Sequence, residues 1–240
     1  MSEIFNPALI IVDVQEDFLP PDGSLAVNDG REIIPKILEL MDLSKFNWKL
    51  IIATKDWHPS DHTSFASYHN QEPYSTKVFS HPLKEIDPST NEVMLKTQVL
   101  WPDHCVQHTK GSEITKEIQD KLEELEKKNE IPIKIVKKGY IQDREYYSCF
   151  QDTWGIHHTE CGSILKENGI TDVFTVGIAY DYCVLNSSMD SSKLGYTTFV
   201  VKDYCRAVDA SANEQTEKCY KDNNVSIISS KDDIFQKLLK

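Results

Sequence analysis

Six apolar segments of strand length alternate along the chain with helical segments. The six segments are residues 8–14, 48–56, 131–139, 172–178, 197–203 and 224–229. Most are rich in Val and Ile without alternating polar residues, which is typical of strands covered on both faces. Helical patterns occur at residues 30–42, 112–128, 159–169, 181–195, 210–223 and 230–239. This alternation predicts an α/β fold, a single domain over residues 1–240 with a three-layer αβα sandwich and a mostly parallel six-stranded sheet.

One segment interrupts the alternation. Residues 57–111 hold six of the eight His, two of the four Trp and five of the ten Pro. A connection of this length without regular structure is uncommon in a compact domain and is usually functional or disordered. Its aromatic content argues against disorder. Because it follows the carboxyl end of a predicted strand, where open α/β sheets bind ligands, we expect a ligand-binding insertion at about residues 57–111.

Charge and composition limit the partners. The formal net charge is -12 at pH 7, so we expect no nucleic acid and no anionic membrane as partners. No apolar run in the sequence is long enough to cross a bilayer. Without a secretory signal or a targeting tripeptide we expect a cytoplasmic protein, with nuclear or peroxisomal co-import and a homo-oligomer left open. The six Cys are widely spaced without a CxxC pair, which predicts reduced thiols.

Three predicted strands run into polar residues of chemical interest. Asp13 lies at the end of the first apolar segment, Lys137 and Lys138 lie at the end of the segment at residues 131–139, and Cys183 comes soon after residues 172–178. The carboxyl ends of parallel strands meet at one edge of a sheet, so we expect these groups to lie together. Each alone has a simpler explanation. Asp13 can be satisfied by backbone N–H groups, a lysine after a strand usually faces solvent, and Cys183 can pack as a small apolar residue.

Together, a carboxylate, an ammonium group and a thiol predict hydrolysis of an amide through a thioester. A thiol beside an ammonium group at a helix N-terminus is expected to have a lowered pKa and to form thiolate. The carboxylate can accept the thiol proton and return it to the leaving amine. Backbone N–H groups near the helix start can hold an oxyanion.

A second group of residues predicts a metal site. Asp56 and His58 are two positions apart in "KDWHPSDH", so on an extended segment both point the same way. His104 in "LWPDHC" is the best candidate for a third ligand. Two imidazoles and a carboxylate suit Zn, Fe or Mn, with positions left for water or a ligand. Alternatively, all three are loop residues satisfied by hydrogen bonds.

An ordered set of motifs carries a resemblance over nearly the whole chain. The sequence resembles the nicotinamidase branch of the cysteine-hydrolase (isochorismatase-like) superfamily, in its eukaryotic form with a long insertion. The motifs are "IIVDVQEDF", "KDWHPSDHTSF", "EPYST", "LWPDHCVQHTKGSE", "KKGYIQDREYYSCF" and "VGIAYDYCVLNSS". Short pieces such as DxH are weak evidence, whereas the ordered set is specific.

The resemblance implies a role for each matching position. Asp13, Lys138 rather than Lys137, and Cys183 match the catalytic residues, and Ile178-Ala179 matches a cis peptide that aims the Ala179 amide, with that of Cys183, at an oxyanion. The metal ligands would be Asp56, His58 and His104. Four aromatic residues match the walls of a pyridine pocket: Phe18, Trp101, Tyr147 and Tyr182. For these four, core packing is the alternative.

The implied activity is hydrolysis of nicotinamide, the expected small-molecule partner, to nicotinate and ammonia in NAD salvage, with pyrazinamide also accepted. The implied cofactor is one divalent ion, Zn, with Fe or Mn as alternatives. Other interpretations remain open. Relatives that act on carbamoyl amides generally lack the metal ligands, and isochorismatases lack the nucleophilic Cys. An inactive ligand-binding scaffold would not need Asp13, Lys138 and Cys183 together, and a redox protein would need a resolving Cys.

Overall fold

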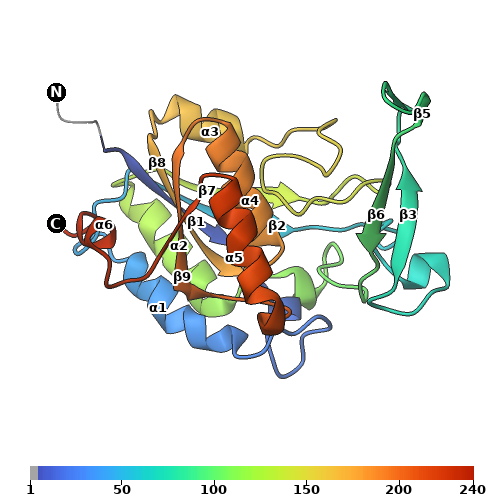
Figure 1. The fold of residues 1–240 in the computed structure, drawn as a ribbon. Coiled ribbons are helices and arrows are strands. Elements are labelled where there is room, and N and C mark those ends of the chain that lie inside the picture. The colour runs from blue at the N-terminus through green and yellow to red at the C-terminus, as the bar shows by residue number, and fades with distance from the viewer. Residues whose placement is uncertain (1–4) are drawn as a thin grey trace.

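The computed structural model describes residues 5–240, so the first four residues of the predicted domain lie outside it. Its central sheet has six strands in the order β10-β9-β8-β1-β2-β7 (Figure 1). Every pairing in this sheet is parallel, which confirms the predicted α/β class. The strands are β1 (Pro7–Val12), β2 (Leu50–Asp56), β7 (Ile133–Lys138), β8 (Asp172–Ile178), β9 (Thr197–Arg206) and β10 (Ser226–Ile228).

Helices cover both faces of the sheet. The apolar side chains of α1 (Ile34–Leu40), α2 (Lys116–Lys128) and α6 (Asp233–Gln236) join one buried cluster. Those of α3 (Cys161–Glu167), α4 (Cys183–Lys193) and α5 (Asn213–Asp222) join a second cluster on the opposite face. Short 3-10 helices cover Glu16–Phe18, Gly30–Ile33, Ser67–His69, Lys110–Ser112 and Ala210–Ala212. Among the described residues, no helix has both the length and the apolarity that a membrane crossing requires.

The strands divide their residues strictly between these two faces. In β2, Ile51 and Ala53 belong to the cluster under α1 and α2, whereas Leu50 and Ile52 belong to the cluster under α3, α4 and α5. Successive side chains of a strand point to opposite faces. Beyond Ala53 the alternation therefore places Lys55 on the α2 side and Asp56 on the α4 side of the sheet.

Several helix boundaries differ from the sequence-based expectation: α2, for example, begins at Lys116 rather than at residue 112. The helix predicted at residues 30–42 begins with a 3-10 turn and becomes α-helical only at Ile34, one residue before Pro35. The helix predicted at residues 181–195 begins at Cys183, because Tyr182 has the non-helical angles φ -129 and ψ -89. Cys183 is therefore the first residue of α4.

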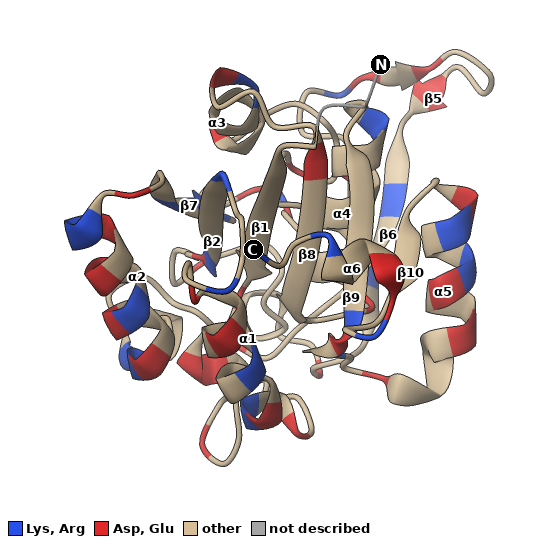
Figure 2. Ribbon diagram, turned by 90° about the vertical axis from the view of Figure 1, so that its left-hand side faces the viewer, with Lys and Arg blue, Asp and Glu red and all other residues tan. Residues whose placement is uncertain are grey.

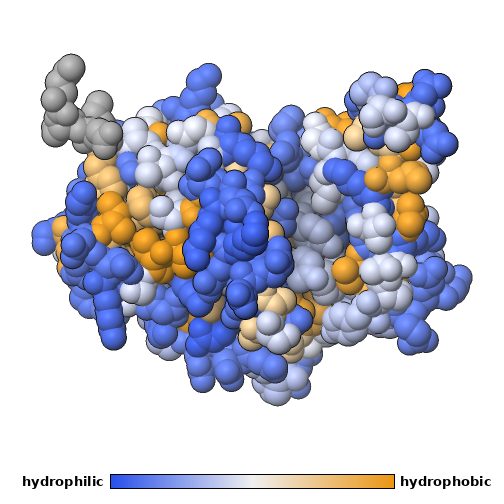
Figure 3. All heavy atoms as spheres, in the orientation of Figure 1, coloured by the Kyte–Doolittle hydropathy of each residue, from blue (hydrophilic) through white to orange (hydrophobic). Residues whose placement is uncertain are grey.

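The insertion contains two small antiparallel sheets. β3 (Thr76–Ser80) pairs with β6 (Leu95–Val99), and β4 (Ile86–Asp87) pairs with β5 (Glu92–Val93). We call residues 76–99 the arm, which stands beside the main sheet (Figure 1). Apolar side chains lie on its surface (Figure 3); Val78 and Leu95 are 57% and 58% exposed. The two ends of the insertion meet again, since His58 forms a parallel bridge with Val106.

Candidate active site

The three predicted polar groups at the strand ends lie in contact. The Nζ atom of Lys138, the last residue of β7, lies 2.9 Å from Asp13 Oδ2 and 3.4 Å from Cys183 Sγ. Asp13 follows β1, and Cys183 begins α4 after β8. Asp13 and Lys138 are 0% exposed, and Cys183 is 7% exposed. The structure thus brings carboxylate, ammonium and thiol together, as expected from the convergence of parallel strand ends.

A hydroxyl group fixes the carboxylate. Thr54 on β2 donates its hydroxyl to Asp13 Oδ1 at 2.5 Å and accepts the Asp13 backbone N–H at 3.1 Å. Asp13 has a φ of 48, which non-glycine residues seldom adopt. The unusual backbone turns the side chain out of the strand direction, and Thr54 holds it. The other carboxylate oxygen, Oδ2, therefore remains directed at Lys138.

Two backbone amides lie beside the thiol. The Ile178–Ala179 peptide bond is cis, as the resemblance implied. The Ala179 carbonyl accepts the amides of Tyr182 and Val184, each at 3.0 Å, which fixes the turn between β8 and α4. Within residues 5–240, the amides of Ala179 and Cys183 are not used in such turn or loop hydrogen bonds. Both N–H groups are therefore available to an oxyanion.

The expected lowering of the Cys183 pKa is wrong. Burial raises the pKa of the thiol, and the negative charges of Asp13 and Asp56 raise it further, against the opposing effect of Lys138. The sequence predicted that the Lys138 ammonium group lies near the thiol. It did not predict that both Asp13 and Asp56 contact that ammonium group. The Lys138 pKa itself is raised: burial acts against its charge, but Asp13 and Asp56 outweigh that effect. The resting site therefore holds a protonated thiol next to a charged lysine.

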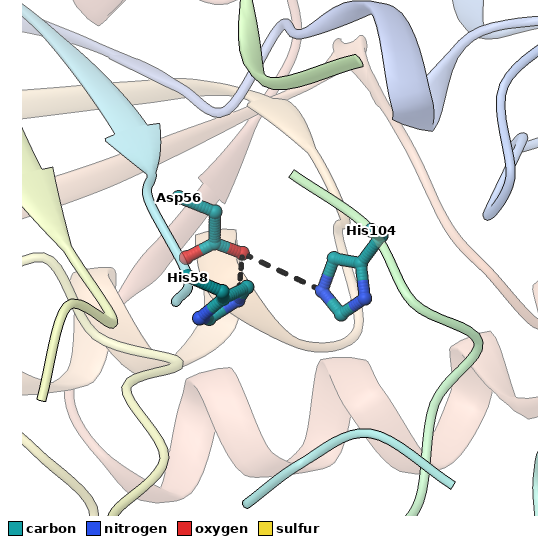
Figure 4. A group of neighbouring side chains, drawn as sticks. All are labelled: Asp56, His58 and His104. Carbon is teal, nitrogen blue, oxygen red and sulfur yellow. Dashed lines mark ion pairs between the residues drawn. The ribbon is translucent and has the colours of Figure 1, made fainter. Parts of the chain in front are cut away.

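The three predicted metal ligands form a compact cluster (Figure 4). The Nε2 atoms of His58 and His104 lie 3.6 Å and 3.9 Å from the same atom, Asp56 Oδ2. Both Nδ1 atoms lie 2.8 Å from backbone carbonyl oxygens, of Gly139 and Pro102 respectively. A carbonyl can only accept, so each Nδ1 carries a hydrogen, and in the neutral form of each ring Nε2 presents its lone pair.

This arrangement fits a metal ion. Protein His ligands usually donate the second ring nitrogen to a carbonyl or carboxylate, as both do here. Within residues 5–240, the buried Nε2 atom of His58 has no hydrogen-bond partner, and a bound cation would satisfy it. Burial and the neighbouring His58 lower the pKa of His104 to about 4, which keeps its imidazole neutral. Asp56, His58 and His104 offer ligand atoms within 4.8 Å of one another.

Gly139 and Gln15 support the cluster. A Cβ atom on Gly139 would lie 2.4 Å from His58 Cε1, and the residue has a φ of +72. Gln15, which is fully buried, donates to the Asp56 carbonyl at 2.8 Å and accepts the Asp56 amide at 2.8 Å. The ligand-bearing end of β2 is thereby tied to the chain that follows β1.

Lys138 joins the two centres. Its Nζ atom also donates to Asp56 Oδ1 at 2.6 Å, while Asp56 Oδ2 faces the two imidazoles. Although burial alone would raise the pKa of Asp56, Lys138 and His58 hold it below its usual value. The Asp56 carboxylate is therefore ionised, with Oδ1 on the Lys138 ammonium group and Oδ2 facing the two imidazoles.

A pocket opens over both centres. Its cavity volume is about 30 Å³, and all four predicted aromatic residues line it: Phe18, Trp101, Tyr147 and Tyr182. Trp101 donates its indole N–H to the Tyr147 hydroxyl at 3.1 Å and packs edge-on against Tyr182, with ring centroids 4.8 Å apart. These side chains border open space rather than only packing in the core. Asp56, His104, Ala179 and Cys183 complete the polar wall.

Several residues at the site escaped the sequence-based prediction. Glu145, 3% exposed, lines the pocket together with Leu25 and Val208. Burial raises the pKa of its carboxyl. Glu145 belongs to the quoted motif "KKGYIQDREYYSCF", and Gln15 belongs to "IIVDVQEDF". Their presence in motifs was the only available signal, since an acidic residue in a polar loop otherwise indicates a solvent-facing side chain.

A parallel α/β sheet with a thiol at this edge, in contact with a carboxylate and an ammonium group, defines the class of cysteine hydrolases. A sequence profile described as "Isochorismatase domain" matches residues 7–232. The chain belongs to the isochorismatase family, and its similarity to known proteins places it with the nicotinamidases of that family.

The sequence is 40% identical to the nicotinamidase of Saccharomyces cerevisiae over 92% of this chain and 98% of the yeast protein. The solved structure of the yeast nicotinamidase superimposes with a TM-score of 0.82, covering 92% of this chain and 99% of the yeast chain at 37% identity. The same enzyme bound to the inhibitor nicotinaldehyde gives a TM-score of 0.80, with 93% and 99% covered at 37% identity. A zinc complex of the Pyrococcus horikoshii pyrazinamidase gives 0.66 at 28% identity, with 93% and 99% covered.

Proposed function

We propose that this protein hydrolyses nicotinamide to nicotinate and ammonia, with Cys183 as the nucleophile of a thioester route. The observation that carries the proposal is the contact of Lys138 with Asp13 and with Cys183, which lines an aromatic pocket. The similarity to nicotinamidases over nearly the whole chain supports the same substrate. The inhibitor nicotinaldehyde, bound by the yeast enzyme, has the pyridine ring that such a pocket would take.

We propose that Asp56, His58 and His104 hold one divalent ion, with water at the remaining positions. Zinc is our first choice, with iron and manganese as alternatives, because imidazole and carboxylate ligands suit all three. A zinc complex exists for the P. horikoshii pyrazinamidase. When bound, such an ion supplies a Lewis acid for the pyridine nitrogen. The cluster also argues against a carbamoyl amide, which has no ring nitrogen to bind there.

The residues of the chain then orient the carboxamide. The aromatic walls enclose the pyridine ring, and the carboxamide carbon faces Cys183 Sγ. As the thiol proton moves to Asp13 Oδ2, Sγ bonds to the carboxamide carbon, and the resulting oxyanion accepts the amides of Ala179 and Cys183. Lys138 stabilises the negative charge that passes between sulfur and carboxylate.

Asp13 next returns the proton to the carboxamide nitrogen. The C–N bond breaks, ammonia leaves and the acyl group remains on sulfur as a thioester. Asp13 then takes a proton from water, and the hydroxide attacks the same carbon. Cleavage of the C–S bond releases nicotinic acid, which ionises to nicotinate, and Asp13 returns its proton to sulfur, which regenerates the thiol. The raised pKa of Asp13, caused by burial and opposed by Lys138, suits a group that must both accept and donate a proton near neutral pH.

An ammonia-release assay tests the proposal, with nicotinamide and benzamide as paired substrates. Benzamide has the same shape without the ring nitrogen. We expect zinc-loaded protein to release ammonia rapidly from nicotinamide, more slowly from benzamide, and from neither after alkylation of Cys183. Pyrazinamide, which retains a ring nitrogen at the same position, should also be hydrolysed. Absence of ammonia from nicotinamide with zinc-loaded protein would refute the proposed activity.

A further inference from the structure

A groove lined by four lysines lies on the opposite side of the sheet from Cys183. It opens between the start of α2, the 3-10 turn at Lys110–Ser112 and the carboxyl ends of β2 and β7, with a volume of about 620 Å³. Its lysines are Lys55, Lys110, Lys116 and Lys137. We call it the lysine groove. Figure 2 shows basic segments on β2 and β7 beside α2. Such a concentration of positive charge is unexpected in a chain with a net charge of -12.

The strand alternation creates the centre of this groove. Lys55 and Lys137 are register partners across β2 and β7, just as Asp56 and Lys138 are. One pair faces α2 and the other faces Cys183, because neighbouring residues of a strand point to opposite faces. Two positive charges on neighbouring strands and on the same face of the sheet repel each other. The Lys55–Lys137 pair therefore carries a cost that a bound anion would remove.

Trp57 holds both ammonium groups in place. The Nζ atoms of Lys55 and Lys137 each lie 4.4 Å from the centroid of its ring. Within residues 5–240, neither these two lysines nor Lys110 has a carboxylate within ion-pair distance, whereas Lys116 contacts Asp120 at 2.6 Å. Burial and the charge of Lys137 lower the pKa of Lys55, against the opposing charge of Glu113.

The other walls indicate the rest of the ligand. Ile114 and Ile135 form an apolar surface, and Ile135 is 42% exposed on an edge strand. Glu113 and Gln119 provide hydrogen-bonding groups next to it. Glu16 also reaches the groove but is paired with Arg31 at 2.6 Å. A carboxylate beside a phosphate-binding region is a common partner of ribose hydroxyls.

We propose that the lysine groove binds a nucleoside polyphosphate. The lysines would bind the phosphate groups, Glu113 and Gln119 the ribose, and Ile114 with Ile135 the base. The volume lies in the usual range for small-molecule sites. The groove shares no lining residue with the aromatic pocket, so the proposal is independent of the proposed amidase activity.

Isothermal titration calorimetry with ADP at low salt tests this proposal. Lys55→Gln/Lys137→Gln is the test variant, and Lys193→Gln/Lys218→Gln, which removes two lysines from α4 and α5, is the charge-matched control. We expect wild type and control to bind ADP alike, and the test variant to bind at least about tenfold more weakly, since hydrogen bonds to charged groups are among the stronger ones. Unchanged nicotinamide hydrolysis would show that the test variant is folded.

Two further probes identify the ligand class. Inorganic pyrophosphate should bind more weakly than ADP, and adenosine more weakly still, if phosphate and nucleoside both contribute. Equal affinity for pyrophosphate and ADP would overturn the nucleoside part of the proposal. No binding of ADP by wild type, or equal losses in the two double variants, would overturn the site itself.

Discussion

Lys138 places its ammonium nitrogen 3.4 Å from the sulfur of Cys183, and the same nitrogen contacts the carboxylates on both sides of it. This single cation offsets two buried negative charges in the resting site. When Cys183 loses its proton, the new negative charge on sulfur must share the same partner. The energy of the thiolate is therefore set by how much charge Asp13 carries at that moment, and this relationship determines the predictions for the catalytic residues.

Cys183→Ala should abolish turnover of nicotinamide while leaving its binding nearly unchanged. The substitution removes the proposed nucleophile but neither the aromatic walls nor the metal-type cluster. Steady-state ammonia release and titration calorimetry with nicotinamide measure the two effects. Residual turnover above the uncatalysed rate would contradict the covalent route.

Asp13→Asn should separate thiol reactivity from hydrolysis. Because the Asp13 charge raises the pKa of Cys183, its removal should lower that pKa. The pH profile of Cys183 alkylation should therefore shift to lower pH, with faster alkylation at pH 7 than in wild type. Turnover should nevertheless fall by about 100-fold or more, the usual contribution of general acid–base catalysis.

Iodoacetamide kinetics between pH 6 and 10 follow the alkylation, with ammonia release measured in parallel. Asp120→Asn on the exposed face of α2 serves as the control and should change neither. An alkylation profile that does not move in Asp13→Asn would show that the carboxylate does not control the thiol.

His104→Ala should weaken zinc binding and raise the KM for nicotinamide by a large factor. The rate of Cys183 alkylation should change much less. Loss of a partner to a metal ligand already costs about 10–100-fold in affinity, and loss of a ligand should cost at least as much. Zinc content after dialysis against a chelator gives a readout that does not depend on activity. His158→Ala, outside the cluster, is the control, and equal zinc retention in both variants would assign His104 to a purely structural role.

Gly139→Ala should disrupt the metal-type cluster, with Gly169→Ala as a matched control. Both glycines have a positive φ, +72 and +62, but a Cβ at Gly169 has nothing within 4 Å, whereas one at Gly139 meets the His58 ring. The control should lose only about 1–2 kcal/mol from backbone strain. Gly139→Ala should lose more and should also retain less zinc. Equal unfolding free energies, measured in urea, would show that the ring moves aside at no cost.

The sequence was sufficient to predict the main sheet and the residues that meet at its edge. Val- and Ile-rich runs identify buried parallel strands because both faces are covered, and parallel strands necessarily deliver their carboxyl ends to one side. Asp13, Lys138 and Cys183 could be placed together on that basis alone, whereas Asp56 was assigned only to the metal site and its contact with Lys138 was not foreseen. His104 was proposed as the third metal ligand from its sequence context, and the resemblance implied the same role, although nothing local ties it to β2.

Other features depend on distant residues and were not predictable. The Thr54–Asp13 hydrogen bond and the Gln15–Asp56 hydrogen bonds connect adjacent strand ends that are 41 positions apart in sequence. The sign of the Cys183 pKa shift depends on a balance among four buried charged or ionisable groups. The arm strands were missed because residues 76–80 ("TKVFS") are exposed at alternate positions and only partly buried between them, with no buried face to produce a recognisable pattern.

The insertion leaves the sheet at His58 and returns at His104, and the two imidazoles face one carboxylate oxygen. An ion bound between them would hold the two ends of the insertion together. A change in the length or composition of the outer part of the insertion need not alter the distance between His58 and His104. The geometry of the Asp56, His58 and His104 cluster is therefore independent of the length of the arm.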